Sequence, residues 1–231
     1  MTARPVPRDI EPRVMYAVMT AEPLKTDDLI PPPSPDLLRK YGTSEVALRR
    51  LRSRHHQTLL LRTPDIDDAA FVHRDARVEA LRLAEEHDGV VIDLGIPRVV
   101  DEAAADVSLA RASQWYVVDY SALDSGRLVT VGLAAFGLPE VAVEDVRHDR
   151  HAMVGAVLAG LVHRLIAEWP ANDPVGVATV TLRDIAYGLG DPQAPETPRD
   201  RSIEVSIDYE PDAGHLVLRL LADPAAALFA P

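Results

Sequence analysis

The chain contains no cysteine among its 231 residues. This absence excludes thiol catalysis, iron–sulfur clusters, thiolate zinc sites and disulfide frameworks. A chain of this length buries roughly 70–75% of its unfolded surface, so it needs no disulfide or structural metal in order to fold. The sequence therefore predicts a core that is held together by side-chain packing.

The signatures of common nucleotide-binding and serine-dependent enzymes are also missing. The sequence has no G-x-G-x-x-G, no P-loop and no G-x-S-x-G elbow. The segment GLGDPQ (188–193) matches neither nucleotide-binding loop. These absences favour a binding protein over an enzyme, and we expect no cofactor.

Targeting signals and long apolar runs are lacking as well. The first residues, MTARPVPRDIEPR, alternate charges and prolines and do not resemble a signal peptide. No apolar run approaches the ~18–20 residues that a membrane-spanning helix requires. We therefore expect a cytoplasmic protein with no membrane partner.

The charge balance is acidic, with 24 basic and 36 acidic residues, a formal net charge of −12 and a pI near 5.0. Such a chain repels nucleic acid and anionic membranes overall. The one arginine-rich segment, LRRLRSRHH (48–56), is typical of the solvated end of a helix, where cations are favourable. The composition therefore predicts no nucleic-acid partner and favours a basic protein partner.

The first half of the chain, about 13–100, predicts a β-α-β-α-β order. The expected strands are 14–21, 57–63 and 90–94, with a strong helix within 65–89. Phe71, Val78, Leu81 and Ala84 recur at helical spacing and predict its apolar side, and His73 is interpreted as a surface residue. Ser34 followed by Pro35 predicts the start of an earlier helix.

The second half, about 113–222, is richer in hairpins. We expect strands at 114–120, 127–133, 141–146 and 175–182, a final hairpin at 201–221, a helix at 150–169 and a loop at 188–200. These patterns predict one enlarged α+β domain at 13–222, preceded by a disordered tail at 1–12 and followed by a tail at 223–231. Its largely antiparallel sheet would have helices on one face, and two ferredoxin-like halves are one possible arrangement.

The stretch VGLAAFGLPE (131–140) is the least ordinary in the chain. Pro139 fixes its own φ and pushes Leu138 towards an extended conformation, whereas Gly137 can adopt a positive φ. We therefore expect a sharp turn in which Phe136 and Leu138 fill the space between sheet and helix. Only Glu140 of this turn has chemical capacity.

This stretch also resembles a known type of sequence. VTVGLAAFGLPEVAVEDV is similar to a G-L-x-x-F-G-L-P-E segment of a bacterial domain-of-unknown-function family, and EEHDGVVIDLGIPRVV (86–100) matches its earlier strand loosely, departing from it at Asp88. The resemblance implies an α+β protein with no assigned activity. It also implies that such a protein acts as a binding or immunity-like partner in a contact-dependent or secretion-associated system.

Three carboxylates are weak catalytic candidates because they follow predicted strands. Asp93 and Asp119 each end a strand and Glu140 follows the turn, so a pair of them could perform general acid–base chemistry if burial raised one pKa. The alternative is that each carboxylate accepts hydrogen bonds from the following loop. Trp115 and Phe136, with Glu140, are the candidate binding residues, although packing is the preferred explanation of the aromatic side chains.

His148 and His151 are the candidate metal ligands. They lie three residues apart where the helix at 150–169 begins, so their imidazoles would share one face and could hold a divalent ion with a carboxylate. The alternative is a polar helix entrance with Asp149 as its cap and two solvated histidines.

Three functions follow from these patterns. The preferred hypothesis is a non-enzymatic interaction module that binds a basic protein partner. A metal-dependent hydrolase using His148 and His151 is the first alternative. A small-molecule sensor with its ligand near Trp115 and Phe136 is the second.

Overall fold

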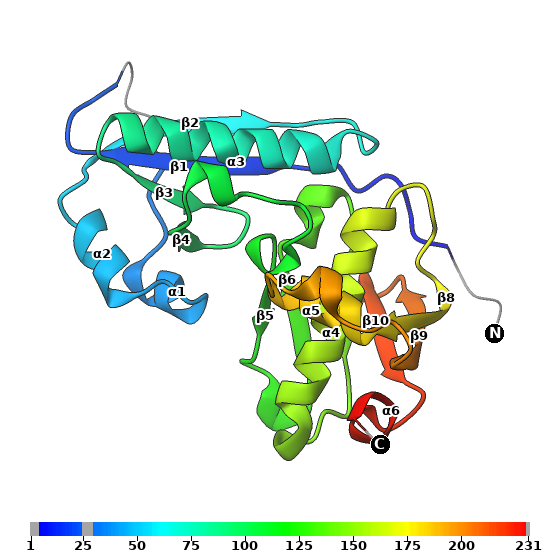
Figure 1. Ribbon diagram of the computed structural model, residues 1–231. Coiled ribbons are helices and arrows are strands. Elements are labelled where there is room, and N and C mark those ends of the chain that lie inside the picture. Colours follow the sequence, from blue (N-terminus) through cyan, green and yellow to red (C-terminus); the bar gives the residue numbers. More distant parts are fainter. Residues whose placement is uncertain (1–4, 25–29, 230–231) are drawn as a thin grey trace. The chain divides into compact units, whose positions relative to one another are not determined.

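The computed structural model describes residues 5–24 and 30–229 (Figure 1). The chain divides into two compact units, one formed by residues 11–107 and the other by 108–231 together with the first ten residues. The boundary falls between the two expected halves, at the point where the sequence changes from helix-rich to hairpin-rich. Mixed helices and sheets in both units confirm the predicted α+β class.

The N-terminal unit contains a four-stranded sheet. Its strands are β1 (Val14–Thr20), β2 (His56–Arg62), β3 (Val90–Asp93) and β4 (Arg98–Val100), in the order β2-β1-β3-β4 with antiparallel neighbours. Helix α3 (Ala69–Glu86) connects β2 to β3, and β1 lies between these two parallel strands. The unit is therefore built on one split β-α-β motif.

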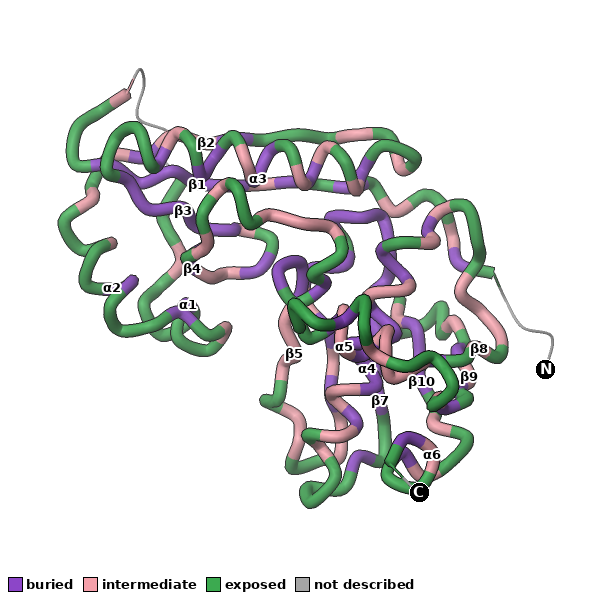
Figure 2. The backbone as a smooth tube through the Cα atoms, viewed as in Figure 1, coloured by how far each residue is buried: buried purple, intermediate pink, exposed green. Residues whose placement is uncertain are grey.

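Helices cover both faces of this sheet. The side chains of Val14, Tyr16 and Val18 pack against α3, whereas those of Ala17 and Met19 pack against the helices α1 (Pro35–Lys40) and α2 (Glu45–Leu51). Because successive strand residues point to opposite faces, β1 is buried almost throughout (Figure 2). The expectation of helices on one face only is wrong for this unit, because α1 and α2 occupy the second face.

Two serine caps fix the short helices of this face. The hydroxyl of Ser34 accepts a hydrogen bond from the Leu37 amide at 3.2 Å, and Pro35 is the first residue of α1 as predicted. The hydroxyl of Ser44 accepts from the Ala47 amide at 3.1 Å and begins α2. Each cap satisfies one of the amides that a helix start leaves without an intrahelical partner.

The C-terminal unit contains a six-stranded sheet in the order β5-β6-β7-β10-β9-β8. Its strands are β5 (Val117–Asp119), β6 (Leu128–Val131), β7 (Val141–Val143), β8 (Gly176–Thr181), β9 (Ser202–Glu210) and β10 (His215–Leu220). The hairpins β5–β6 and β9–β10 are confirmed, and only β7 and β10 pair in parallel. Ile203, Val205 and Ile207 of β9 are buried between exposed or half-buried neighbours, so this strand has one covered face.

Two helices of this unit touch through their backbones. α4 (His151–Glu168) packs against α5 (Leu182–Leu189), and a methyl group on Gly188 would lie 2.1 Å from the carbonyl oxygen of Ala159. Gly188 therefore permits an approach that no other residue type allows. The predicted loop at 188–200 is partly wrong, because the last turn of α5 occupies its start.

The segment His148–Glu168 is long and apolar enough to cross a membrane by length and composition, contrary to the sequence expectation. Half of its most apolar stretch is buried inside the C-terminal unit. The core helix of a globular protein can have the same length and hydropathy.

Both expected tails are partly ordered. Val6 is buried, and its amide donates to the Asp173 carboxylate at 2.9 Å; residues 1–4 lie outside the described residues. Helix α6 (Pro224–Phe229) buries Leu228 near the other end of the chain. Six short 3₁₀ helices complete the described structure: η1 (Ala104–Asp106), η2 (Ala112–Gln114), η3 (Leu123–Ser125), η4 (Leu133–Phe136), η5 (His148–Arg150) and η6 (Ala194–Glu196).

Candidate functional site

Glu140 closes the turn that contains FGLPE. One oxygen of its carboxylate accepts hydrogen bonds from the amides of Gly132 and Leu133 at 2.9 and 3.0 Å, and the other accepts from the Thr130 hydroxyl at 2.7 Å. Burial raises the pKa of Glu140, and these donors oppose that rise. The carboxylate therefore serves the start of η4, whose amides lack helical partners.

The aromatic candidates lie in the core of the C-terminal unit. Trp115 is fully buried and Phe136 is 2% exposed, with their rings perpendicular and their centroids 6.1 Å apart. Strand β5 begins only at Val117, so Trp115 and Tyr116 do not alternate across it, and both are buried. A ligand role for Trp115, Phe136 and Glu140 stays a prediction, because the observed contacts are those of packing and capping.

The other two carboxylate candidates serve the loops that follow their strands. Asp119 Oδ1 accepts from the Ser121 amide at 2.8 Å. Asp93 Oδ1 accepts from the amides of Gly95 and Ile96 at 3.0 and 3.1 Å. Asp93 belongs to the N-terminal unit, whereas Asp119 and Glu140 belong to the C-terminal unit.

A cluster of charged side chains surrounds Asp93 inside the N-terminal unit. Arg77, which is 1% exposed, lies on α3 and approaches two carboxylates. Its Nε is 2.6 Å from Glu102 Oε1, and its Nη1 is 3.9 Å from Asp93 Oδ2. The fully buried Tyr16 is coupled electrostatically to Asp93 and Arg77. Residues from α3, β1, β3 and the segment after β4 thus meet at one buried point.

Burial shifts the pKa values of three side chains in and beside this cluster. Burial raises the pKa of Asp93, although the Arg77 guanidinium opposes the rise. Burial also raises the pKa of Tyr16 well above its usual value, and the Asp93 carboxylate raises it further. For the neighbouring His73, burial and then Arg77 lower the pKa to about 3. Such shifts are typical of functional sites and of structural charge networks alike.

Sequence reasoning missed this cluster because it identified only part of the buried side of α3: Leu81 and Ala84 are buried as expected, but the buried polar residues were not foreseen. His73 is 2% exposed, whereas Phe71, which was expected on the apolar side, is 56% exposed. The small residues Ala76, Ala80 and Ala84 mark the buried side. His73 and Arg77 lie four residues apart on the same stripe, so the alanine spacing was the signal that could have revealed them.

A groove of about 290 Å³ lies beside this cluster, where α3 ends and β4 leads into residues 101–102. Apolar and charged residues both line it, and most of the charged ones are acidic. The apolar lining residues are Leu81, Ala84, Val90, Val91 and Val100, and the charged ones are Glu85, Asp88, Asp101, Glu102 and Arg50.

Glu102 connects the groove to the buried cluster. Its side chain is 22% exposed and lines the groove, while its carboxylate holds Arg77. Asp88, in a left-handed conformation with φ of 47°, pairs with Arg54 at 2.5 Å. Asp101 makes no hydrogen bond or ion pair with any residue in 5–24 or 30–229. The groove therefore combines a fixed carboxylate with others that solvent can reach.

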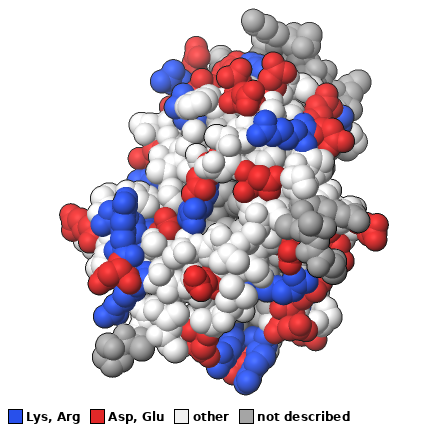
Figure 3. All heavy atoms as spheres, turned by 90° about the vertical axis from the view of Figure 1, so that its right-hand side faces the viewer, with Lys and Arg blue, Asp and Glu red and all other residues white. Residues whose placement is uncertain are grey.

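Two pockets of the C-terminal unit are less acidic than the groove beside Glu102. The first, of about 330 Å³, contains the Arg164–Glu168 ion pair, and the second, of about 500 Å³, contains the Arg150–Asp223 pair. On the face shown in Figure 3, acidic and basic side chains occur side by side and neither sign forms a large patch. Of these three depressions, the groove beside Glu102 has the largest excess of acidic residues.

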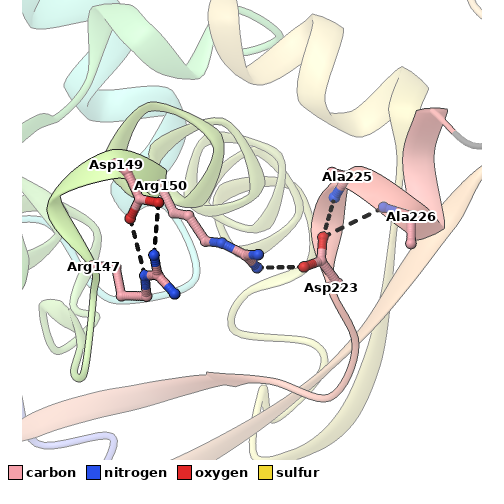
Figure 4. A network of polar contacts seen from close by, with 6 residues as sticks. All are labelled: Arg147, Asp149, Arg150, Asp223, Ala225 and Ala226. Carbon is pink, nitrogen blue, oxygen red and sulfur yellow. Dashed lines mark hydrogen bonds and ion pairs between the residues drawn. The ribbon is translucent and has the colours of Figure 1, made fainter.

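The metal candidates His148 and His151 lie together, with ring centroids 5.4 Å apart. Asp149, the expected cap, is instead paired with Arg147 at 2.9 Å (Figure 4). Within residues 5–24 and 30–229, no three histidine, aspartate or glutamate side chains are grouped so that they could hold a metal ion. The carboxylate that the hydrolase hypothesis requires is therefore not brought to the pair.

Comparisons with protein-family models, curated proteins and solved structures gave no match. The site must therefore be interpreted from its own chemistry.

Proposed function

We propose that this chain is a non-enzymatic interaction module whose N-terminal unit binds a basic segment of a protein partner in the groove beside Glu102. The observation that carries the proposal is one depression lined both by apolar side chains and by charged side chains that are mainly acidic. An arginine or lysine side chain has this same division, because its aliphatic stem packs on apolar surface while its charged end stays polar.

The carboxylate of Glu102 is already held in place within the groove. Arg77 holds Glu102 at the inner end, so this carboxylate does not have to be ordered when the partner binds. Preorganised groups lower the entropic cost of association. Asp101 and Glu85 lie on the more accessible side and supply further negative charge.

The net charge of −12 suits such a partner. Long-range attraction between opposite charges mainly raises the association rate and the specificity of a complex. We further propose that the module acts in the cytoplasm, in an immunity-like or secretion-associated setting. The hydrolase and sensor alternatives receive no comparable support from the structure.

The proposal can be tested with short fluorescent peptides and the full-length chain. Anisotropy titrations would compare an arginine-rich, a lysine-rich and an acidic peptide over a range of salt concentrations. We expect the basic peptides to bind and the affinity to fall as salt rises, because exposed charges are screened. The Asp101→Asn/Glu85→Gln variant should weaken binding by roughly 2- to 30-fold, at ~0.2–1 kcal/mol for each exposed charge pair.

Glu79→Gln is the matched control. Glu79 lies on the same helix but outside the groove, where it pairs with Arg62. Its removal should leave the affinity unchanged beyond the general effect of one charge. Equal losses in Glu79→Gln and the groove variant would show that net charge alone attracts the peptide, and would overturn the proposed site.

A further inference from the structure

His148 and His151 face each other because of how α4 begins. The 3₁₀ helix η5 (His148–Arg150) runs directly into α4 at His151. In 3₁₀ geometry, side chains three residues apart eclipse one another. The two imidazole rings accordingly lie next to each other, with an angle of 42° between their planes.

The ring separation suits a shared metal ion. With Zn–N distances of ~2.0–2.1 Å and a tetrahedral angle, two imidazoles on one ion have centroids about 5.2 Å apart. The observed separation between His148 and His151 is 5.4 Å. The two rings therefore lie at the separation that one shared ion requires.

The tautomer of His151 is also fixed. Its Nδ1 lies 2.6 Å from the carbonyl oxygen of His148. A carbonyl oxygen can only accept, so Nδ1 carries the proton and donates it. Neutral His151 then presents the lone pair of Nε2, and a hydrogen bond of this kind is what orients metal-binding histidines in proteins.

The surroundings do not prevent a cation from binding. The guanidinium groups of Arg147 and Arg150 are paired with Asp149 and Asp223 (Figure 4). His148 is exposed and His151 is half-buried, so an ion can reach them from solvent.

We propose that His148 and His151 together bind one late first-row transition ion, Cu²⁺, Ni²⁺ or Zn²⁺, with solvent at its remaining positions. Imidazole nitrogen suits these ions, and Cu²⁺ should bind most tightly. This site lies in the C-terminal unit and is independent of the groove beside Glu102.

The test uses the full-length chain without a histidine tag. Calorimetric titration with Cu²⁺ and Zn²⁺ gives the stoichiometry, and the electron paramagnetic resonance spectrum of bound Cu²⁺ gives the number of coordinated nitrogens. We expect one ion per chain, two imidazole nitrogens, and a Tm raised by roughly 5–10 °C at a hundredfold excess over Kd. His148→Ala and His151→Ala should each lose this ion and retain the far-UV spectrum.

The control variant is His55→Ala/His56→Ala, which removes a histidine pair of the N-terminal unit and should bind the ion like the wild type. A metal-dependent doubling of mass that both single variants abolish would also support the pair, with a second copy completing the site. Unchanged binding in His148→Ala or His151→Ala, or a Cu²⁺ spectrum with one nitrogen, would overturn the proposal.

Discussion

The two long helices, α3 and α4, are both 18 residues long, but they bury different kinds of side chain. α4 buries apolar side chains and glycine against its sheet, whereas α3 buries His73 and Arg77 among alanines. Burying a charge is costly unless it is paired, so the N-terminal unit depends on Asp93 and Glu102 in a way that the core around α4 does not.

Glu140 and Glu102, one from each unit, differ in the groups that their carboxylates contact. Glu140 accepts from backbone amides and one hydroxyl, so its acceptor capacity serves the local turn. Glu102 holds a buried guanidinium and also lines a groove. A buried charge that reaches the surface can therefore contribute to binding, while one used by the backbone serves the fold.

Arg77→Ala should have the largest effect on stability. It leaves Asp93 and Glu102 without their main cation, and removal of one partner from a buried pair costs about 3–5 kcal/mol. Hydrogen exchange of the N-terminal unit, followed by mass spectrometry, should show this loss across β1, α3 and β3. Arg74→Ala, which removes the exposed pair with Asp75 and the contact of the Arg74 guanidinium with the Phe71 ring, should cost at most about 1 kcal/mol.

Gly188→Ala should destabilise the C-terminal unit next most strongly. Its new methyl group meets the Ala159 carbonyl, and overpacking of this kind costs ~1–3 kcal/mol, here at the upper end because backbone must move. Both tryptophans, Trp115 and Trp169, belong to this unit, so their fluorescence follows its unfolding in urea. Gly155→Ala is the matched control, because its methyl group finds ordinary contact at 3.4 Å and should stabilise α4 slightly.

The stability of the N-terminal unit should also depend on pH. The pKa of His73 is about 3 in the folded state and near 6.5 when unfolded, so below pH 6.5 only the unfolded chain gains this proton. The resulting stability is complete above pH 6.5 and falls by ~1.4 kcal/mol per pH unit towards pH 3. Asp93 acts in the opposite direction, because its pKa is raised.

The His73→Gln variant isolates this effect. The difference in unfolding free energy between wild type and variant should shrink as the pH is lowered from 7 to 5, measured by exchange in the N-terminal unit. A constant difference would show that the pKa of His73 is the same in the folded and the unfolded chain.

Glu140→Gln should have the smallest effect, about 1 kcal/mol, because glutamine keeps one acceptor oxygen for the η4 amides while losing the charge that strengthens those bonds. The change should appear in the tryptophan-detected transition. A loss above 3 kcal/mol would mean that this carboxylate supports more than its turn.

The same contrast explains what the sequence could predict. α4 was predictable because its buried stripe is apolar, and the α+β class followed from the strands and hairpins. The buried side of α3 was predicted only in part, at Leu81 and Ala84, because alanine, histidine and arginine carry little hydrophobic signal. Arg77 and Glu102 are 25 positions apart in the sequence, so only the pairing of β3 with β4 brings them together.

The most direct test of the proposed groove is a nuclear magnetic resonance titration of the ¹⁵N-labelled full-length chain with an arginine-rich peptide. Binding in the groove predicts that the amide signals of residues 81–102 shift first, in the wild type and in Glu79→Gln but much less in Asp101→Asn/Glu85→Gln. Shifts confined to residues 108–229, or shifts that do not weaken in salt, would contradict it.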